Sequence, residues 1–223
     1  AAVGFILYFF LRKKILKYVG QVIFSFGLLF IGLNIMGDVM KPLARNPVFA
    51  EMILKLGETP VLGVLVGTVM TVLIQSSSAT IGVLQNLASQ PVAEGSTQAL
   101  ISLKTAIPIL LGDNIGTTIT ALLASIGAKV NAKRAAAAHS IFNIAGAFIF
   151  IWFIPAFAKF VEIISPKGAE INIIARQIAN AHTAFNMINT LIWLPFIWLL
   201  AKIVTFIVRG KEDTIEKRVL YLD

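Results

Sequence analysis

The sequence predicts an all-α membrane protein, built from transmembrane helices with one re-entrant hairpin and one broken helix. Of its 223 residues, 57% are hydrophobic and only 13% are charged, whereas about a quarter of a soluble domain is charged. The apolar runs are continuous rather than alternating, which favours helices over a β-barrel. Two of these runs carry polar residues near their centres, and such interruptions are typical of backbone buried within a membrane protein.

The apolar segments lie at roughly 1–11, 19–36, 59–93, 97–128, 135–154 and 180–208. Basic clusters between them begin at Arg12, Lys129 and Arg209. The net charge of +8 therefore indicates topology, with these clusters in the cytoplasm, rather than nucleic-acid binding. We expect a multi-pass protein of the cell (inner) membrane, with a transmembrane unit at 1–208 and a cytoplasmic extension starting at 209–223.

Segments 59–93 and 97–128 must together cross the membrane once if all three basic clusters are cytoplasmic. Segment 59–93 carries "QSSS" (Gln75–Ser78) at its centre and ends in the polar stretch "ASQPVAEGSTQ". It is therefore predicted to enter and leave by the same face, as a re-entrant hairpin with Gln75–Ser78 at its tip.

Segment 97–128 exceeds the length of about 20 residues that a helix needs to span a bilayer. We expect two half-helices broken at "PILLGDNIGTT", because Pro108 removes a hydrogen bond and Gly112 and Gly116 permit a bend. Asp113 or Asn114 could cap the second half-helix. Its free N–H groups would then suit an anion at mid-membrane.

The pair "QSSSAT" (75–80) and "GDNIGTT" (112–118) resembles the type II sodium-dependent phosphate cotransporter family. The resemblance implies symport of inorganic phosphate with Na⁺ as the coupling ion and no organic cofactor. By position, it implies a phosphate site made of Gln75, Ser76, Ser77, Ser78, Asn114, Gly116, Thr117 and Thr118.

Members of that family carry two such repeats in inverted orientation, whereas this chain has one QSSS element. It therefore resembles one half of an inverted-repeat transporter, most like the second repeat. Its implied partners in the lipid bilayer are an upstream repeat, which the basic bias favours, or a second copy of the chain in a homodimer. The opening apolar residues then look like the tail of a helix from a longer protein.

Side-chain oxygens of these motifs suit Na⁺, and the candidates are Gln75, Ser77, Ser78, Asp113, Asn114 and Thr118. Asp113 departs from the family, which more often has Ala or Ser at that position. As a lone acid within an apolar segment it is expected to serve the cation. The alternative is that Asp113 only caps a helix.

The sequences "AHSIFN" (138–143) and "AHTAFN" (181–186) echo one another. His139 with Asn143, and His182 with Asn186, share helix faces. They are predicted to form a polar seam that hydrogen-bonds across the bundle, the alternative being a contact with a proton or the substrate.

An enzyme is not expected, because the sequence contains no nucleophile–base pair and no metal motif. Two other functions remain open beside phosphate symport. One is a membrane-embedded phosphate sensor that signals through its charged tail, and the other is a transporter of another oxyanion.

Overall fold

The computed structural model describes residues 1–10, 13–44 and 59–210, so nearly all of the predicted cytoplasmic extension lies outside the described residues. The described residues form helices and connecting loops without a β-strand, apart from an isolated bridge between Pro91 and Ala99. The helices are α1 (Ala2–Phe10), α2 (Lys14–Ala44), α4 (Pro60–Ile74), α5 (Ser77–Ala88), α6 (Leu103–Ala124), α7 (Val130–Phe150), η1 (Ile151–Phe153), α8 (Ile154–Ile164), α9 (Glu170–Trp193), η2 (Leu194–Phe196) and α10 (Ile197–Ile207).

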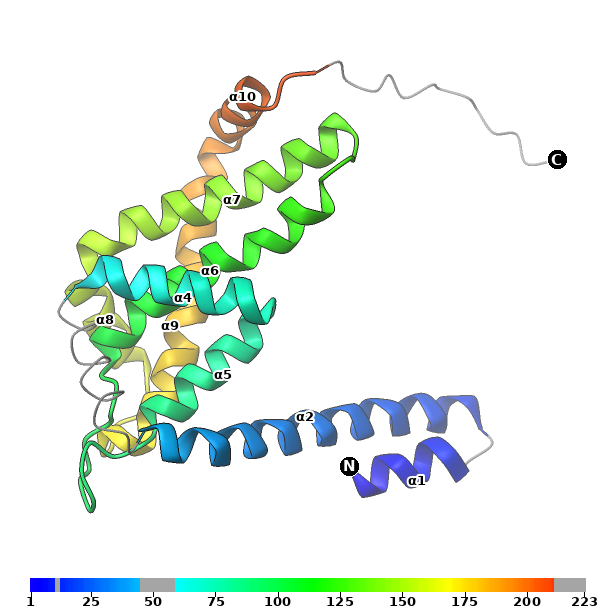
Figure 1. Cartoon of the computed structure of the whole chain (residues 1–223), viewed down its shortest axis with the longest axis vertical. Coiled ribbons are helices and arrows are strands. Elements are labelled where there is room, and N and C mark those ends of the chain that lie inside the picture. The colour runs from blue at the N-terminus through cyan, green and yellow to red at the C-terminus, as the bar shows by residue number, and fades with distance from the viewer. Residues whose placement is uncertain (11–12, 45–58, 211–223) are drawn as a thin grey trace.

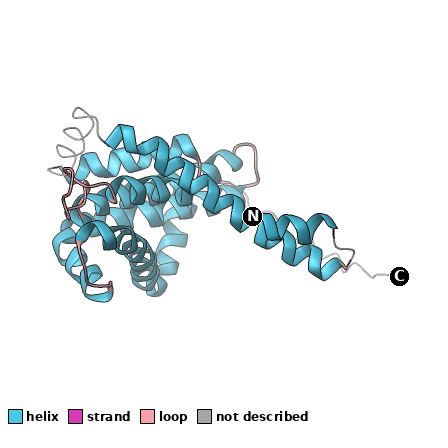
Figure 2. Ribbon diagram, turned by 90° about the horizontal axis from the view of Figure 1, so that it is seen from below, coloured by secondary structure: helices cyan, strands magenta, loops and turns pink. Residues whose placement is uncertain are grey.

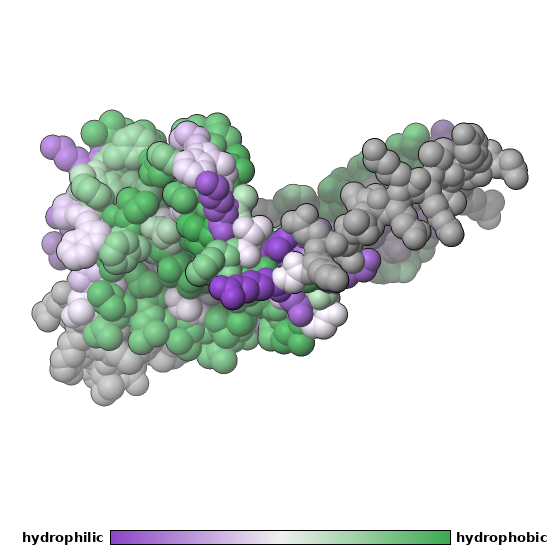
Figure 3. All heavy atoms as spheres, turned by 90° about the horizontal axis from the view of Figure 1, so that it is seen from above, coloured by the Kyte–Doolittle hydropathy of each residue, from purple (hydrophilic) through white to green (hydrophobic). Residues whose placement is uncertain are grey.

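Helices α4 to α10 form one body, from which the hairpin of α1 and α2 projects (Figures 1 and 2). Among the described residues, three helical segments are long and apolar enough to cross a membrane: Leu103–Ala124, Val130–Ile164 and Glu170–Ile207. Apolar side chains cover most of the face of the body seen in Figure 3. An outer surface of this kind suits contact with lipid.

Helix α6 lies at the centre of the body and contacts α4, α5, α7, α8 and α9. Its residues from Ala106 to Asn114 are all buried. Ile107, Leu110 and Leu111 have no exposed surface. The second of the two sequence motifs is therefore carried by the most enclosed helix of the described chain.

The predicted break within 97–128 is wrong, because α6 is one continuous helix through Pro108 and the GDNIGTT motif. Its glycines allow close packing instead of a bend. A Cβ placed on Gly112 would overlap the Val64 carbonyl oxygen of α4, and a Cβ on Gly67 would overlap the Ile109 carbonyl oxygen of α6. Small residues at such a crossing let two helix backbones touch, and Thr68 Oγ1 donates to the Gly112 carbonyl at 3.1 Å.

The echo between "AHSIFN" and "AHTAFN" extends to the fold. The first unit consists of α7, η1 and α8, and the second consists of α9, η2 and α10. Helix α9 ends at Trp193, 43 residues after α7 ends at Phe150. Helix α10 ends at Ile207, 43 residues after α8 ends at Ile164. A proline accompanies each 3₁₀ turn: Pro155 is the second residue of α8, directly after η1, and Pro195 is the middle residue of η2. Proline cannot continue a regular helix. These two helical units therefore form an internal repeat separate from the QSSS repeat.

The two units pack with equivalent residues facing one another. Gly146 is the counterpart of Asn189, and a Cβ on Gly146 would lie 2.6 Å from the Asn189 Cγ. Phe150 meets Phe185 at a centroid distance of 4.9 Å, and the corresponding pair, Phe142 and Trp193, meets at 6.4 Å. Helices α7 and α9 thus cross antiparallel, about a local two-fold axis near Gly146.

Candidate functional site

The QSSS motif forms the turn between α4 and α5, where the chain reverses direction (Figure 1). Gln75 caps α4 in the left-handed conformation, with φ 56°. Ser76 caps α5, because its side chain accepts a hydrogen bond from the Ala79 N–H at 3.3 Å. Ser77 and Ser78 then begin helix α5. The connection between the two helices is therefore Gln75 and Ser76, which is shorter than the predicted tip of Gln75–Ser78. Gln75, Ser76 and Ser78 are exposed.

A chain of hydroxyl groups joins this hairpin to α6. Thr80 Oγ1 of α5 lies 3.1 Å from Thr71 Oγ1 of α4, and Thr71 Oγ1 lies 2.7 Å from Asp113 Oδ1 of α6. All three residues have no exposed surface. The Thr71 hydroxyl is the donor to Asp113 and to Thr80, and the Thr80 hydroxyl in turn donates to the Ser76 carbonyl of the turn at 3.2 Å.

The second carboxylate oxygen of Asp113, Oδ2, is buried and has no hydrogen-bond partner among the described residues. His182 of α9 is its nearest basic group, with Nε2 at 3.9 Å and a side chain 33% exposed. Asp113 lies in the middle of α6, so the alternative that it caps a helix is wrong. A buried carboxylate oxygen of this kind can accept a hydrogen bond or coordinate a cation.

The other polar residues of GDNIGTT bond to their own helix. Asn114 Nδ2 donates to the Leu110 carbonyl at 2.9 Å. Thr117 and Thr118 each donate at 2.8 Å, to the carbonyls of Asp113 and Ile115. Each of these side chains therefore has a donor bonded within α6. Residues 112–118 lie inside the continuous helix, so the predicted helix N-terminus facing an anion is absent here.

The two motifs lie at neighbouring heights along the axes of α4 and α6. Helices α4 and α6 run in the same direction, since Gly63 meets Pro108 near the start of both helices and Gly116 meets Thr71 further along. The turn at Gln75 therefore lies beyond the level of Gly116, toward the end of α6. Within the described chain, hydrogen bonds through Thr71 and Thr80 link the hairpin to Asp113.

Sequence reasoning missed both Thr71 and Thr80 as site residues. Thr80 is the last residue of the quoted motif QSSSAT, and Thr71 precedes Gln75 by four residues. Residues four apart share a helix face, so the spacing between Thr71 and Gln75 could have indicated that Thr71 lies on the side of α4 that faces the site.

The predicted polar seam differs from the bonds that the structure contains. Asn143 and Asn186 donate to the carbonyls of His139 and His182 on their own helices, at 3.0 Å and 2.9 Å. The hydrogen bond that crosses from α9 to α7 comes from Asn189 Nδ2 to the Phe142 carbonyl, at 3.2 Å. The hydrogen bonds of Asn143 and Asn186 that the structure contains therefore lie within their own helices.

Comparison with known proteins finds a bacterial relative and several mammalian ones. A protein of Bacillus subtilis (strain 168) named Uncharacterized protein YqeW is 30% identical over 168 residues, which are 75% of this chain and 52% of the relative. Human sodium-dependent phosphate transport protein 2B is 39% identical over 99 residues, which are 43% of this chain and 13% of the relative. Rabbit (Oryctolagus cuniculus) sodium-dependent phosphate transport protein 2A is 31% identical over 118 residues, which are 50% of this chain and 15% of the relative.

The chain thus spans about half the length of the bacterial relative and a far smaller share of the mammalian ones. No solved structure matches it. The family model described as Na+/Pi-cotransporter matches residues 35–166, more than half of the chain and including both QSSS and GDNIGTT. The chain therefore belongs to the Na⁺/Pi-cotransporter family.

Proposed function

We propose that the protein carries out sodium-coupled symport of inorganic phosphate by alternating access, and that this chain supplies one half of an inverted-repeat transporter. One observation carries the proposal: a buried carboxylate, Asp113, is linked through two threonines to a turn that exposes serine hydroxyls. Hydrogen bonds thereby connect hydroxyl groups that can bind an anion to a carboxylate that can bind a cation.

The phosphate end of this site is the start of α5. Ser77 and Ser78 occupy its first turn, where backbone N–H groups have no partner within the helix. The helix dipole adds a partial positive charge at the same place. With the hydroxyls and the Gln75 amide, these groups would hold phosphate oxygens. Gly116, which packs against α4, would contribute space rather than a ligand.

The sodium end of the site is the region around Asp113. Asn114 follows Asp113 directly, and Thr118 lies five residues after Asp113 on the same helix; both are buried, and their side-chain oxygens still have acceptor capacity. Burying an unpaired phosphate dianion would cost many kcal/mol, and a cation bound nearby offsets that cost. Binding of each ion should therefore raise the affinity for the other.

Two contacts support a hairpin that returns to the face by which it entered. Helix α4 begins beside the start of α6, and α5 leads back toward that same start through the loop 89–102. This loop touches the start of α9, since the Ala99 N–H donates to Glu170 Oε2 and the Ile171 N–H donates to the Thr97 carbonyl, both at 3.2 Å. Cysteines at Ser96 and Lys167 should therefore react from the same side of the membrane.

The exposed turn supports the need for a second half. Irregular, polar backbone at membrane depth must be buried in protein or line a water-filled cavity. A second repeat placed over Gln75, Ser76 and Ser78 would supply that cover, as expected where two repeats meet around a substrate. The basic bias of the loops favours a repeat within the same polypeptide over a second copy inserted in the opposite orientation.

Flux measurements test the proposal. The full-length protein in liposomes should accumulate radiolabelled phosphate when a Na⁺ gradient is imposed, and not when choline replaces Na⁺. Ligand binding without flux would favour the sensor, and stronger competition by sulfate than by phosphate would favour another oxyanion. Equal phosphate uptake in Na⁺ and in choline would contradict sodium coupling.

A further inference from the structure

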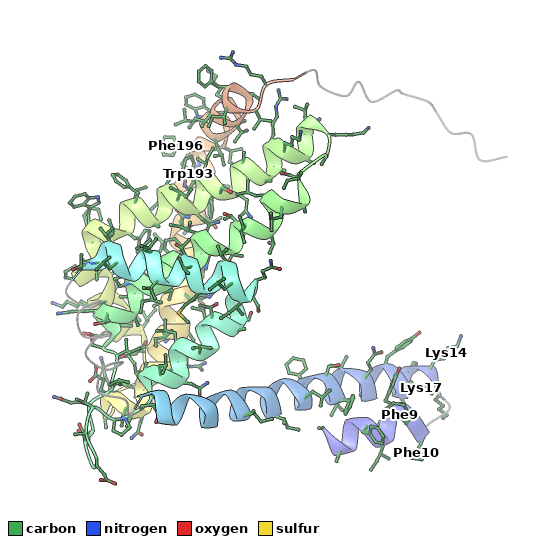
Figure 4. The ribbon with its side chains drawn as sticks, in the orientation of Figure 1. Phe9, Phe10, Lys14, Lys17, Trp193 and Phe196 are labelled. Carbon is green, nitrogen blue, oxygen red and sulfur yellow. The ribbon has the colours of Figure 1, made fainter. Side chains whose placement is uncertain are left out.

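A pocket of about 380 Å³ lies between α1 and α2, far from the site around Asp113. Its lining residues are Tyr8, Phe9, Lys14, Lys17, Tyr18 and Gln21. Figure 4 shows the lysines on α2 and Phe9 on α1, at the end of the hairpin where the two helices are joined. Each polar side chain of this lining carries at least one hydrogen-bond donor.

The charged side chains among the described residues of this pocket are two lysines, Lys14 and Lys17. None of the described residues that line it is acidic. Lys14 is the first residue of α2, whose first turn contains no acidic residue. The positive end of the helix dipole therefore adds to the two lysine charges, so the pocket suits an anion.

The surroundings of the pocket are apolar and aromatic. Phe9 packs against Phe5 at a centroid distance of 4.5 Å and against Tyr8 at 4.8 Å. Phe9 and Phe10 are 57% and 72% exposed. Aromatic rings beside lysines are typical of the boundary between headgroups and hydrocarbon, and this basic cluster is predicted to be cytoplasmic. An anion bound here would lie beside surface suited to an acyl chain.

We propose that this pocket binds the phosphate-bearing headgroup of an anionic phospholipid. Lys14 and Lys17 would neutralise the phosphate, the Tyr8 and Tyr18 hydroxyls and the Gln21 amide would donate to its oxygens, and Phe9 would face the glycerol and acyl chains. Basic pockets between membrane helices on the cytoplasmic side are known hosts for such headgroups. Free phosphate shares the headgroup's charge but would gain nothing from the aromatic rim, which favours the lipid.

Native mass spectrometry of the delipidated full-length protein tests this assignment. Phosphatidylglycerol and phosphatidylcholine would be offered separately at equal concentrations, the former also in competition with inorganic phosphate. The double variant Lys14→Gln/Lys17→Gln should weaken phosphatidylglycerol binding about 30-fold, as expected for two charges near the membrane surface. The double variant Lys133→Gln/Lys159→Gln removes the same net charge elsewhere and should leave this binding unchanged.

The expected result is preferential binding of phosphatidylglycerol that depends on Lys14 and Lys17 and persists in millimolar inorganic phosphate. Thermal midpoints equal to wild type would show that the variants fold. A Tyr8→Phe variant, which keeps the ring and loses one donor, should show a smaller loss of binding. Equal binding of both lipids, equal losses in both double variants, or full displacement by inorganic phosphate would each overturn the proposal.

Discussion

Replacing Gly112 by alanine would separate α4 from α6. The new Cβ would overlap the Val64 carbonyl oxygen and lie 2.8 Å from the Thr68 nitrogen. Both are backbone atoms that cannot rotate away, so the helices would have to move apart. That movement would also lengthen the hydrogen bond from Thr68 Oγ1 to the Gly112 carbonyl, now 3.1 Å.

The size of the effect follows from three contributions. Forcing an extra carbon into a packed interface costs about 1–3 kcal/mol. Losing the threonine hydrogen bond costs about 0.5–1.5 kcal/mol, and the better helix propensity of alanine returns about 1 kcal/mol. Gly112→Ala should therefore lower the free energy of unfolding by about 2 kcal/mol, given these contributions.

Tryptophan fluorescence of the full-length protein during heating would report this loss as a thermal midpoint several degrees lower. Gly32→Ala is the matched control, since Gly32 also lies within a helix but a Cβ there would meet nothing within 4 Å. Its midpoint should stay unchanged or rise. If Gly112→Ala kept the wild-type midpoint while slowing transport, Gly112 would be a bending point and the packing argument would be refuted.

Three further changes test the site and the bundle. Asp113→Asn should raise the Na⁺ concentration needed for half-maximal phosphate uptake, and an unchanged Na⁺ dependence would remove Asp113 from the cation site. Thr71→Val should cost about 1–3 kcal/mol of stability, because it removes the donor to buried Asp113 Oδ1; a midpoint equal to wild type would contradict this. Ser76→Ala should cost about 0.5–1 kcal/mol through loss of the α5 cap and should weaken phosphate binding, which calorimetry would measure.

Composition and motif spacing were sufficient to predict the class of this protein and its family. Long apolar runs predicted helices long enough to cross a membrane, and the described part of the chain contains three such segments. The paired motifs QSSSAT and GDNIGTT indicated the family that the family model then matched over residues 35–166. The turn at Gln75 and Ser76 was also predictable, because polar residues interrupt an apolar segment at that point.

The roles of individual residues were less predictable, because the same residue types serve different purposes in different surroundings. Gly112 and Gly116 indicated a bend when read in sequence, whereas they contact the backbone of α4 in the fold. His139 and His182 belong to the same sequence echo, yet His182 lies 3.9 Å from Asp113 and His139 is exposed. Sequence similarity between two segments does not reveal which of them will face the central helix.

The sequence by itself determined the helical membrane class, the family and the position of the polar turn, since these depend on local composition and on spacing along the chain. Only the tertiary structure decided that α6 is continuous, that Thr71 and Thr80 join the hairpin to Asp113, and that Asn189 rather than Asn143 or Asn186 bridges α7 and α9. These features arise where helices distant in sequence come into contact. Hydrogen-bond partners and room for a side chain are properties of that contact, and so they follow from the packing of the helices.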